Sequence, residues 1–215
     1  MPLEIIERTF GPVQNNTYLL ADTGQKRAVI IDPTFRPVML QADLKNHGLH
    51  LDAIWLTHAH FDHLGGVEAL LAENPPPVQV GLHPADLPLW QSDAGAGLFG
   101  QPFSMNIEPD LLLADGQELY VGEYPVKVLH TPGHSPGHVI FYIPSLSTAI
   151  VGDLIFRGGV GRTDLPGGDS TTLIQSIQEK ILTLPEETIL LPGHGPSTTV
   201  ELERDTNPYL NGFAF

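Results

Sequence analysis

The chain has 215 residues, enough for one large domain or two merged half-domains. Its formal net charge of −15, with only 10 lysine and arginine residues, would repel a phosphate backbone or an anionic bilayer, so nucleic acid and membranes are not expected partners. Cysteine is absent, which excludes disulfides, thiolate metal sites and a thiol nucleophile.

The segment Met1–Glu4 contains no basic patch followed by an apolar run, and no stretch of the chain approaches ~18 uninterrupted apolar residues. A cytoplasmic location is therefore expected. Any metal ion must be held by nitrogen and oxygen ligands, because no thiolate is available.

Short runs of apolar and β-branched residues predict ten strands. In chain order these are residues 3–9, 17–21, 28–31, 53–56, 78–81, 118–121, 126–130, 139–143, 148–151 and 188–191. Helices are predicted at residues 38–46, 66–73, 171–182 and 200–205, with Ser170 and Thr199 as N-caps. Residues 91–108 have no clear period and suggest a loop beside a site. This mixture of elements favours an α/β or α+β arrangement of packed sheets with helices outside.

Histidine or aspartate follows four of the predicted strands. The strand at residues 53–56 is followed by Thr57-His58-Ala59-His60-Phe61-Asp62-His63, which holds four potential ligands within six residues. His134, Asp153 and His194 each come shortly after another strand. Because open sheets commonly build sites where their strands end, we expect these side chains to converge.

Imidazole and carboxylate groups suit zinc, iron or manganese, and zinc is our first choice. The segment His58–His63 offers too many ligands for one ion, because the adjacent residues Asp62 and His63 cannot point to the same place as His58 and His60. Two divalent ions resolve this geometry, with a carboxylate binding one ion through each oxygen. The assignment gives the first ion to His58, His60 and His134, the second to Asp62, His63 and His194, and the bridge to Asp153.

A water held between two such ions would be acidified from ~15.7 towards ~7, which provides hydroxide as a nucleophile at neutral pH. One ion would polarise a scissile carbonyl and stabilise the oxyanion. Asp62 is the candidate catalytic residue, because it would lie near the bridging water and could orient it or accept its proton.

The pattern H-x-H-x-D-H at His58–His63, followed by His134, Asp153 and His194, resembles the metallo-β-lactamase superfamily. The resemblance implies an αβ/βα sandwich, two facing mixed sheets with helices outside and the site at one edge. It also implies that residues 1–215 form a single metallo-hydrolase domain. In the family, the position matched by Asp32 supports a ligand without binding the ion. His130 and His138, which flank the His134 loop, are further candidates for such support.

Within the superfamily, the chain most resembles the short form of hydroxyacylglutathione hydrolase, or glyoxalase II. Flavin-linked di-iron members carry Glu where His60 stands, and the lactamases proper lack a carboxylate at the position of Asp153, which argues against both activities. In the glyoxalase branch a basic residue at the position of Arg162 contacts the glutathione carboxylate, so Arg162 is the predicted substrate contact, with a surface or structural salt bridge as the alternative. Because only residues 195–215 follow His194, we expect no counterpart of the helical C-terminal domain of the long enzymes.

These observations predict a dinuclear hydrolase that cleaves a thioester such as S-lactoylglutathione by a metal-bridging hydroxide. A mononuclear iron persulfide dioxygenase is the main alternative, with His58, His134 and Asp153 as a facial triad. Lactone or phosphoester hydrolysis would use the same ions. A non-catalytic metal-binding module is the remaining class, although structural sites fill their coordination spheres and leave no room for water. The sequence does not decide the metal, the acyl group or the oligomeric state.

Overall fold

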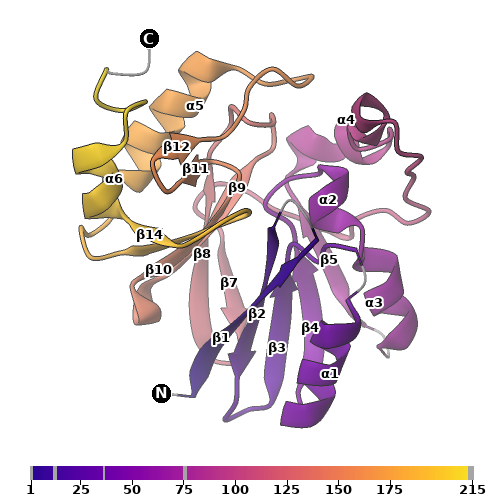
Figure 1. Cartoon of the computed structure of the whole chain (residues 1–215). Coiled ribbons are helices and arrows are strands. Elements are labelled where there is room, and N and C mark those ends of the chain that lie inside the picture. The colour runs from indigo at the N-terminus through magenta and orange to yellow at the C-terminus, as the bar shows by residue number, and fades with distance from the viewer. Residues whose placement is uncertain (1, 12–13, 36, 75–76, 213–215) are drawn as a thin grey trace.

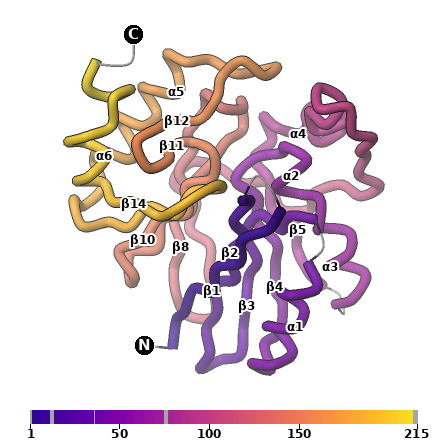
Figure 2. Tube along the Cα trace, in the orientation of Figure 1, coloured from indigo at the N-terminus to yellow at the C-terminus, as the bar shows by residue number. Residues whose placement is uncertain are grey.

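The computed structural model describes residues 2–11, 14–35, 37–74 and 77–212. Met1 and residues 213–215, which belong to the predicted single domain, lie outside the described residues. Two six-stranded sheets face each other, and helices cover the outer face of each (Figure 1). The trace in Figure 2 shows that the N-terminal half of the chain builds one side of the molecule and the C-terminal half builds the other.

The first sheet has the strand order β1-β2-β3-β4-β5-β6. Its strands are β1 (Leu3–Phe10), β2 (Asn15–Asp22), β3 (Arg27–Ile31), β4 (His50–Trp55), β5 (Gln79–Leu82) and β6 (Leu111–Leu112). Strands β3 to β6 pair in parallel, and β1 and β2 are antiparallel to their neighbours. The edge strand β1 alternates between more and less buried residues, while β2 is buried throughout, as expected for an inner strand covered on both faces.

The second sheet has the order β14-β13-β10-β9-β8-β7. Its strands are β7 (Glu118–Val121), β8 (Tyr124–His130), β9 (Val139–Ile143), β10 (Thr148–Gly152), β13 (Ile189–Pro192) and β14 (Thr198–Thr199). A separate hairpin consists of β11 (Ile155–Phe156) and β12 (Gly159–Val160). Strands β10 and β13 are parallel, whereas β8 and β10 are both antiparallel to β9.

Helices lie on the outer faces of both sheets. The α-helices are α1 (Val38–His47), α2 (Phe61–Leu64), α3 (Val67–Glu73), α4 (Leu87–Trp90), α5 (Ser170–Ser176) and α6 (Val200–Thr206). The shorter turns are η1 (Pro84–Asp86), η2 (Ala96–Phe99), η3 (Pro144–Leu146) and the π-helical η4 (Ile177–Ile181). Within the described ranges, no helix combines the length and hydrophobicity that a membrane crossing requires.

Three buried hydrophobic clusters hold these layers together. The central cluster joins the two sheets, and in it the rings of Trp55 and Phe141 stack with centroids 5.5 Å apart. A second cluster packs α1, α2 and α3 against the first sheet, and a third packs α5, η4 and α6 against the second. The burial of apolar surface in these layers supplies the main favourable term for folding.

The strand directions bring distant loops to one edge of the sandwich. Because β3 and β4 are parallel, Asp32 and Thr57 follow them at the same edge. In the other sheet, the pairing of Gly152 with Pro192 at the ends of β10 and β13 brings Asp153 close to His194. Strand β8 runs in the same direction as β10, so its following loop reaches this edge as well.

All ten predicted strands and four predicted helices are present, with shifts of at most a few residues at their ends. The predicted helix at 171–182 is wrong in its second half, where α5 gives way to the π-helical η4. Its N-cap is Asp169 instead of Ser170, because the Asp169 side chain accepts a hydrogen bond from the backbone N–H of Thr172. Thr199 is confirmed as the N-cap of α6.

Candidate metal centre

Three histidines meet in the group predicted for the first ion. One ligand atom from each of His58, His60 and His134 lies within 4.8 Å of the others. The Nδ1 atom of His60 and the Nε2 atom of His134 are 2.9 Å apart. His134 donates from Nδ1 to the backbone oxygen of Arg162 over 2.8 Å, which leaves its Nε2 lone pair directed at the site.

The group predicted for the second ion also converges. Ligand atoms of Asp62, His63 and His194 lie within 4.8 Å of one another. The Nε2 atom of His194 is 3.5 Å from Oδ2 of Asp62. Asn15 donates from Nδ2 to that same carboxylate oxygen over 3.0 Å, which fixes the orientation of Asp62.

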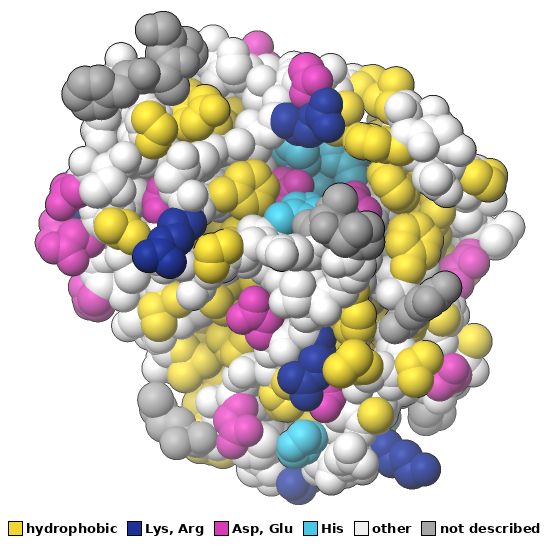
Figure 3. Space-filling model, in the orientation of Figure 1, with side chains coloured by type: hydrophobic (Ala, Val, Ile, Leu, Met, Phe, Trp, Pro, Cys, Tyr) yellow, Lys and Arg dark blue, Asp and Glu magenta, His cyan; other side chains and the backbone are white. Residues whose placement is uncertain are grey.

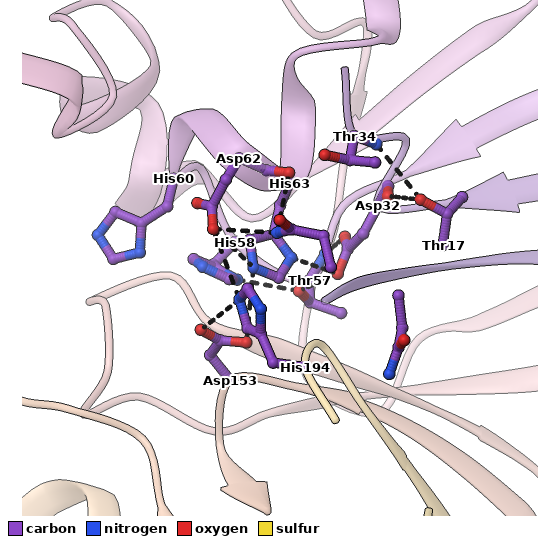
Figure 4. Close-up of polar contacts among 12 residues, drawn as sticks. Thr17, Asp32, Thr34, Thr57, His58, His60, Asp62, His63, Asp153 and His194 are labelled. Carbon is purple, nitrogen blue, oxygen red and sulfur yellow. Dashed lines mark hydrogen bonds and ion pairs between the residues drawn. The ribbon is translucent and has the colours of Figure 1, made fainter. Parts of the chain in front are cut away.

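Asp153 contacts both groups, and Figure 4 shows its carboxylate turned toward His194. Its Oδ1 atom is 3.5 Å from Nε2 of His63, in the second group. Its Oδ2 atom is 3.7 Å from Nε2 of His134, in the first group, and 3.5 Å from Nε2 of His194. The carboxylate therefore faces both groups at once, which is the position that a bridging ligand requires.

Asp32 positions this cluster through contacts with Thr57 and with the ligand His63. Its carboxylate accepts hydrogen bonds from the backbone N–H of Thr57 over 2.8 Å and from the Thr57 hydroxyl over 2.6 Å. The same carboxylate lies 3.1 Å from Nδ1 of His63. A carboxylate at Nδ1 keeps the proton on that nitrogen and leaves Nε2 as the ligand atom. Asp32 adopts a left-handed backbone conformation with φ of 51°, which is uncommon outside glycine, asparagine and aspartate.

Burial and mutual repulsion favour neutral imidazoles in the first group. Burial, together with the neighbouring His134, lowers the pKa of His60 to about 3. The pKa of His58 also falls well below its ordinary value, because of burial and the nearby His63. Neutral imidazole is the protonation state that binds a metal ion.

Carboxylates dominate the electrostatics of the second group. Although burial opposes it, Asp153 and Asp62 raise the pKa of His63 to about 9. Burial likewise disfavours the charge on Asp153, but His63 and His194 hold the pKa of its carboxyl below the ordinary value. The carboxylates of this group therefore favour a positive charge between them, and either a proton on His63 or a metal ion can supply it.

Three candidate ligand atoms are not engaged in hydrogen bonds in the described part of the chain. Nε2 of His58, Nε2 of His63 and Oδ1 of Asp153 are buried and have no hydrogen-bond partner among the described residues. Buried polar atoms without partners are costly, and a cation in each group, one bound by His58 and one by His63, with Asp153 shared, would remove that cost. The residues present therefore fit a divalent metal site.

Glycines allow the strand ends to approach the ligands. A Cβ atom on Gly193 would lie 2.3 Å from Oδ1 of Asp153 and 2.6 Å from Cε1 of His63. A Cβ atom on Gly152, which has a φ of 48°, would lie 2.5 Å from the Thr57 hydroxyl. Only glycine fits at these two positions without displacing the cluster.

A buried carboxylate that sequence reasoning missed ties two ligand loops together. Asp86, at the end of η1, accepts hydrogen bonds from the backbone N–H groups of Ala59 (3.0 Å) and Gly137 (2.6 Å) and from the Ser135 hydroxyl (2.7 Å). Burial raises the pKa of Asp86 despite these three donors. His83 is the N-cap of η1, because its side chain accepts a hydrogen bond from the backbone N–H of Ala85, but nothing in the sequence indicates where the side chain of Asp86 points.

The start of β2 supports the His194 loop, and this too was missed. Asn16 donates from Nδ2 to the backbone oxygens of Pro192 and Gly195, and the Tyr18 hydroxyl also donates to Pro192. Strand β2 belongs to the first sheet and the His194 loop to the second. These contacts therefore fix one half of the site against the other.

The remaining predicted residues have different surroundings. His138 is fully buried and its ring stacks at 5.3 Å on His58, which agrees with a supporting role. His130 stacks on His83 at 4.0 Å, and its Nε2 atom lies 2.9 Å from the backbone oxygen of Pro136, in the loop that follows His134. Arg162 pairs with both carboxylate oxygens of Asp164, at 2.7 and 2.8 Å.

A cavity of about 1110 Å³ opens over the cluster. Figure 3 shows imidazoles and carboxylates at the bottom of this hollow, with hydrophobic side chains around it. Its lining includes the ligands His60, Asp62, His134, Asp153 and His194, together with Arg162. The cluster is therefore open to a small molecule.

A model of the metallo-beta-lactamase superfamily matches residues 10–194. The chain belongs to this superfamily, whose members are enzymes that bind divalent metal ions. "Probable metallo-hydrolase YqgX" of Bacillus subtilis is 42% identical over 208 residues, covering 95% of this chain and 96% of that protein. "Hydroxyacylglutathione hydrolase GloC" of Haemophilus influenzae is 37% identical over 214 residues, covering 98% of this chain and 99% of that protein.

Solved structures confirm the predicted fold of two facing sheets with helices outside. The crystal structure of BLEG-1 B3 metallo-beta-lactamase superposes with a TM-score of 0.90, at 41% identity over 97% of this chain and all of the other (100%). The crystal structure of TTHA1623 in a di-iron-bound form has a TM-score of 0.84, at 46% identity over 95% of this chain and 100% of the other.

Proposed function

We propose that this protein is a dinuclear metal-dependent hydrolase of thioesters, of the hydroxyacylglutathione hydrolase type. The observation that carries this proposal is the position of Asp153, whose carboxylate faces both the His58, His60, His134 group and the His63, His194 side of the second group. A structural metal site usually has a filled coordination sphere that is closed to solvent. Here two ligand groups share a carboxylate and line an open cavity, which favours a catalytic site.

Two divalent ions bound by these groups would polarise the substrate carbonyl and lower the pKa of a water molecule. Water adds to the carbonyl carbon, the C–S bond breaks, and the products are a carboxylate, a thiol and one proton. Asp62 is the candidate to orient the water or accept its proton, since its Oδ2 atom faces the cluster and is fixed by Asn15. A thiolate leaves without needing a proton, so the reaction requires no further acid.

The thioester class rests on two supports. The family resemblance of the sequence is to glyoxalase II, and a relative of 37% identity that spans nearly the whole chain is a hydroxyacylglutathione hydrolase. Zinc is the first candidate for the metal, and the di-iron form of TTHA1623 supports iron as the second.

Metal analysis of the purified protein, paired with turnover of S-lactoylglutathione and of a panel of simple thioesters, tests the proposal. We expect two ions per chain and thioester hydrolysis that chelation abolishes and zinc or iron restores. One iron per chain, with oxygen uptake on glutathione persulfide, would instead establish the mononuclear dioxygenase. A fully loaded protein that is inert towards thioesters, esters and lactones would establish a non-catalytic metal-binding module.

β-Lactam hydrolysis is a second candidate. The sequence argued against it, because the lactamases proper lack a carboxylate at the position of Asp153. The similarity to BLEG-1, which is described as a B3 metallo-beta-lactamase, supports it nevertheless. Hydrolysis of a chromogenic cephalosporin by the metal-loaded protein, compared with thioester turnover, decides between the two.

A further inference from the structure

The cavity over the metal ligands has two unlike sides. On the side of the first sheet, Phe10, Phe35, Phe61 and Phe99 line it, and we call these four residues the aromatic wall. The Phe61 ring lies 6.2 Å from that of Phe35 and 5.5 Å from that of Phe99. Phe35 and Phe99 are 43% and 49% exposed, so the wall presents apolar surface that a bound molecule could cover.

The opposite side is the hairpin of β11 and β12, whose pairing of Phe156 with Gly159 leaves a two-residue turn, Arg157-Gly158. Phe156 and Arg157 both line the cavity, and we call them the hairpin rim. The Phe156 ring lies 6.3 Å from that of the ligand His194, so the rim adjoins the metal site. A substrate lying across the ligands would reach the aromatic wall with one end and the hairpin rim with the other.

Two cations line this cavity, and they differ in whether their charge is available. Arg162 is held by Asp164 through two hydrogen bonds, and its guanidinium lies 5.9 Å from the ring of Phe99. Arg157 is exposed and has no ion pair or hydrogen bond to any residue that the structure describes. What sets Arg157 apart is its place in the cavity lining, where a guanidinium with no carboxylate partner among the described residues suits an anionic group.

We propose that the substrate is a thioester with a bulky apolar arm, bound by the aromatic wall, and a single carboxylate on the opposite arm, bound by Arg157. This inference rests on the proposed thioester hydrolysis and specifies its substrate class. It assigns the anion contact to Arg157 in place of Arg162, whose charge Asp164 already balances. Glutathione, a polar tripeptide, leaves the aromatic wall uncovered and is a poorer match than an aryl or branched acyl compound.

Matched thioesters test the anion contact. The metal-loaded protein is assayed with S-phenylacetyl mercaptopropionate and its uncharged amide, and with the reversed isomer, the benzyl thioester of succinate, and its amide. We expect the carboxylate to lower KM by about five- to tenfold in at least one of the two pairs. Arg157→Gln should abolish that difference with kcat nearly unchanged, whereas the control Lys45→Gln, which removes an exposed cation on α1, should keep it.

The aromatic wall is tested in the same assay. Phe99→Ala should raise KM for S-phenylacetyl mercaptopropionate by about three- to tenfold. It should have little effect on KM for S-acetyl mercaptopropionate, which lacks the phenyl ring. Leu98→Ala is the matched control, because Leu98 is the neighbouring residue of η2, is 62% exposed and is outside the cavity lining. Equal losses in the two variants, or no carboxylate advantage in either isomer, would overturn the proposed substrate class.

A binding measurement separates this inference from the proposed function. The thioether S-phenethyl mercaptopropionate and its amide cannot be hydrolysed, and calorimetry gives their Kd for the wild type and Arg157→Gln. A carboxylate preference that disappears in the variant supports the ligand class even if no thioester is turned over. Thioester turnover without any carboxylate preference in KM or Kd supports hydrolysis and contradicts this inference.

Discussion

The carboxylate of Asp32 lies 3.1 Å from Nδ1 of His63, and both side chains are almost completely buried. This contact sets which imidazole nitrogen of His63 carries a proton, and therefore which one faces Asp153. It joins the end of β3 to the ligand loop after β4, two strands that run in parallel.

Asp32→Asn should weaken metal binding by about 10- to 100-fold. Asp32 accepts three hydrogen bonds, two from Thr57 and one from His63. In asparagine one carboxylate oxygen is replaced by an NH2 group, which cannot accept, so at least one of these hydrogen bonds would be lost. Competition with a chromogenic chelator measures the affinity. Asp52→Asn, at a surface pair with Arg27, is the control and should bind metal like the wild type. Unchanged affinity in Asp32→Asn would show that the contact does not orient a ligand.

Asp153→Ala should lower both metal content and turnover, because one carboxylate faces both ligand groups. We expect fewer than two ions per chain and a loss of thioester turnover of more than about a hundredfold. Elemental analysis after dialysis measures the first quantity and a thiol-detecting assay the second. Asp164→Ala, which removes an exposed carboxylate beside the cavity, should keep its metal. Near-normal loading of Asp153→Ala would contradict the bridge.

Gly193→Ala should disrupt the site although it adds a single methyl group. That group would lie 2.3 Å from Oδ1 of Asp153, so either the carboxylate or the His194 loop must move. We expect weaker metal binding and a loss of about 1–3 kcal/mol in the free energy of unfolding. Gly159→Ala is the control, since its nearest neighbour would be Cβ of Phe156 at 3.9 Å. Equal metal affinity and stability in the two variants would be inconsistent with this close approach.

Asp86 should give the metal-free protein a distinctive pH dependence. Its pKa is raised in the folded state by burial, so folding favours the protonated carboxyl. Its contribution to stability is therefore fully present below its ordinary pKa and is lost as pH rises through the raised value. Urea unfolding of the wild type and of Asp86→Asn, compared from acidic to neutral pH, measures this. The wild type's advantage over the variant should shrink with rising pH, and an advantage that grows would refute the raised pKa.

Sequence patterns predicted the elements of this fold that have enough residues to show a period. The eight-residue β1 and the apolar runs of β3, β4 and β10 are examples, and the helices after Pro37 and Thr199 began as expected. The two-residue strands β11 and β12 were missed because two residues cannot establish an alternation. The helical pattern at 171–182 gave no sign of the π-helical turn, which depends on packing against the second sheet.

The candidate ligands were predictable because they are close in sequence or directly follow a strand. Supporting residues were harder to find, because their role depends on where one side chain points across the fold. Asp86 and Asn15 reach ligand loops that are 27 and 47 residues away along the chain. A salt bridge was the alternative that the sequence left open for Arg162, and its partner is Asp164, only two residues away along the chain.

The candidate ligands are divided between the two sheets, with His58–His63 on the first and Asp153 and His194 on the second. During synthesis on the ribosome, the first sheet can emerge and fold while the segment that carries His194 has not yet been made. The early chain would then hold half of a binding site, with weak affinity for any ion. Full metal affinity, and with it chemical activity, would arise only when the last quarter of the polypeptide joins the fold.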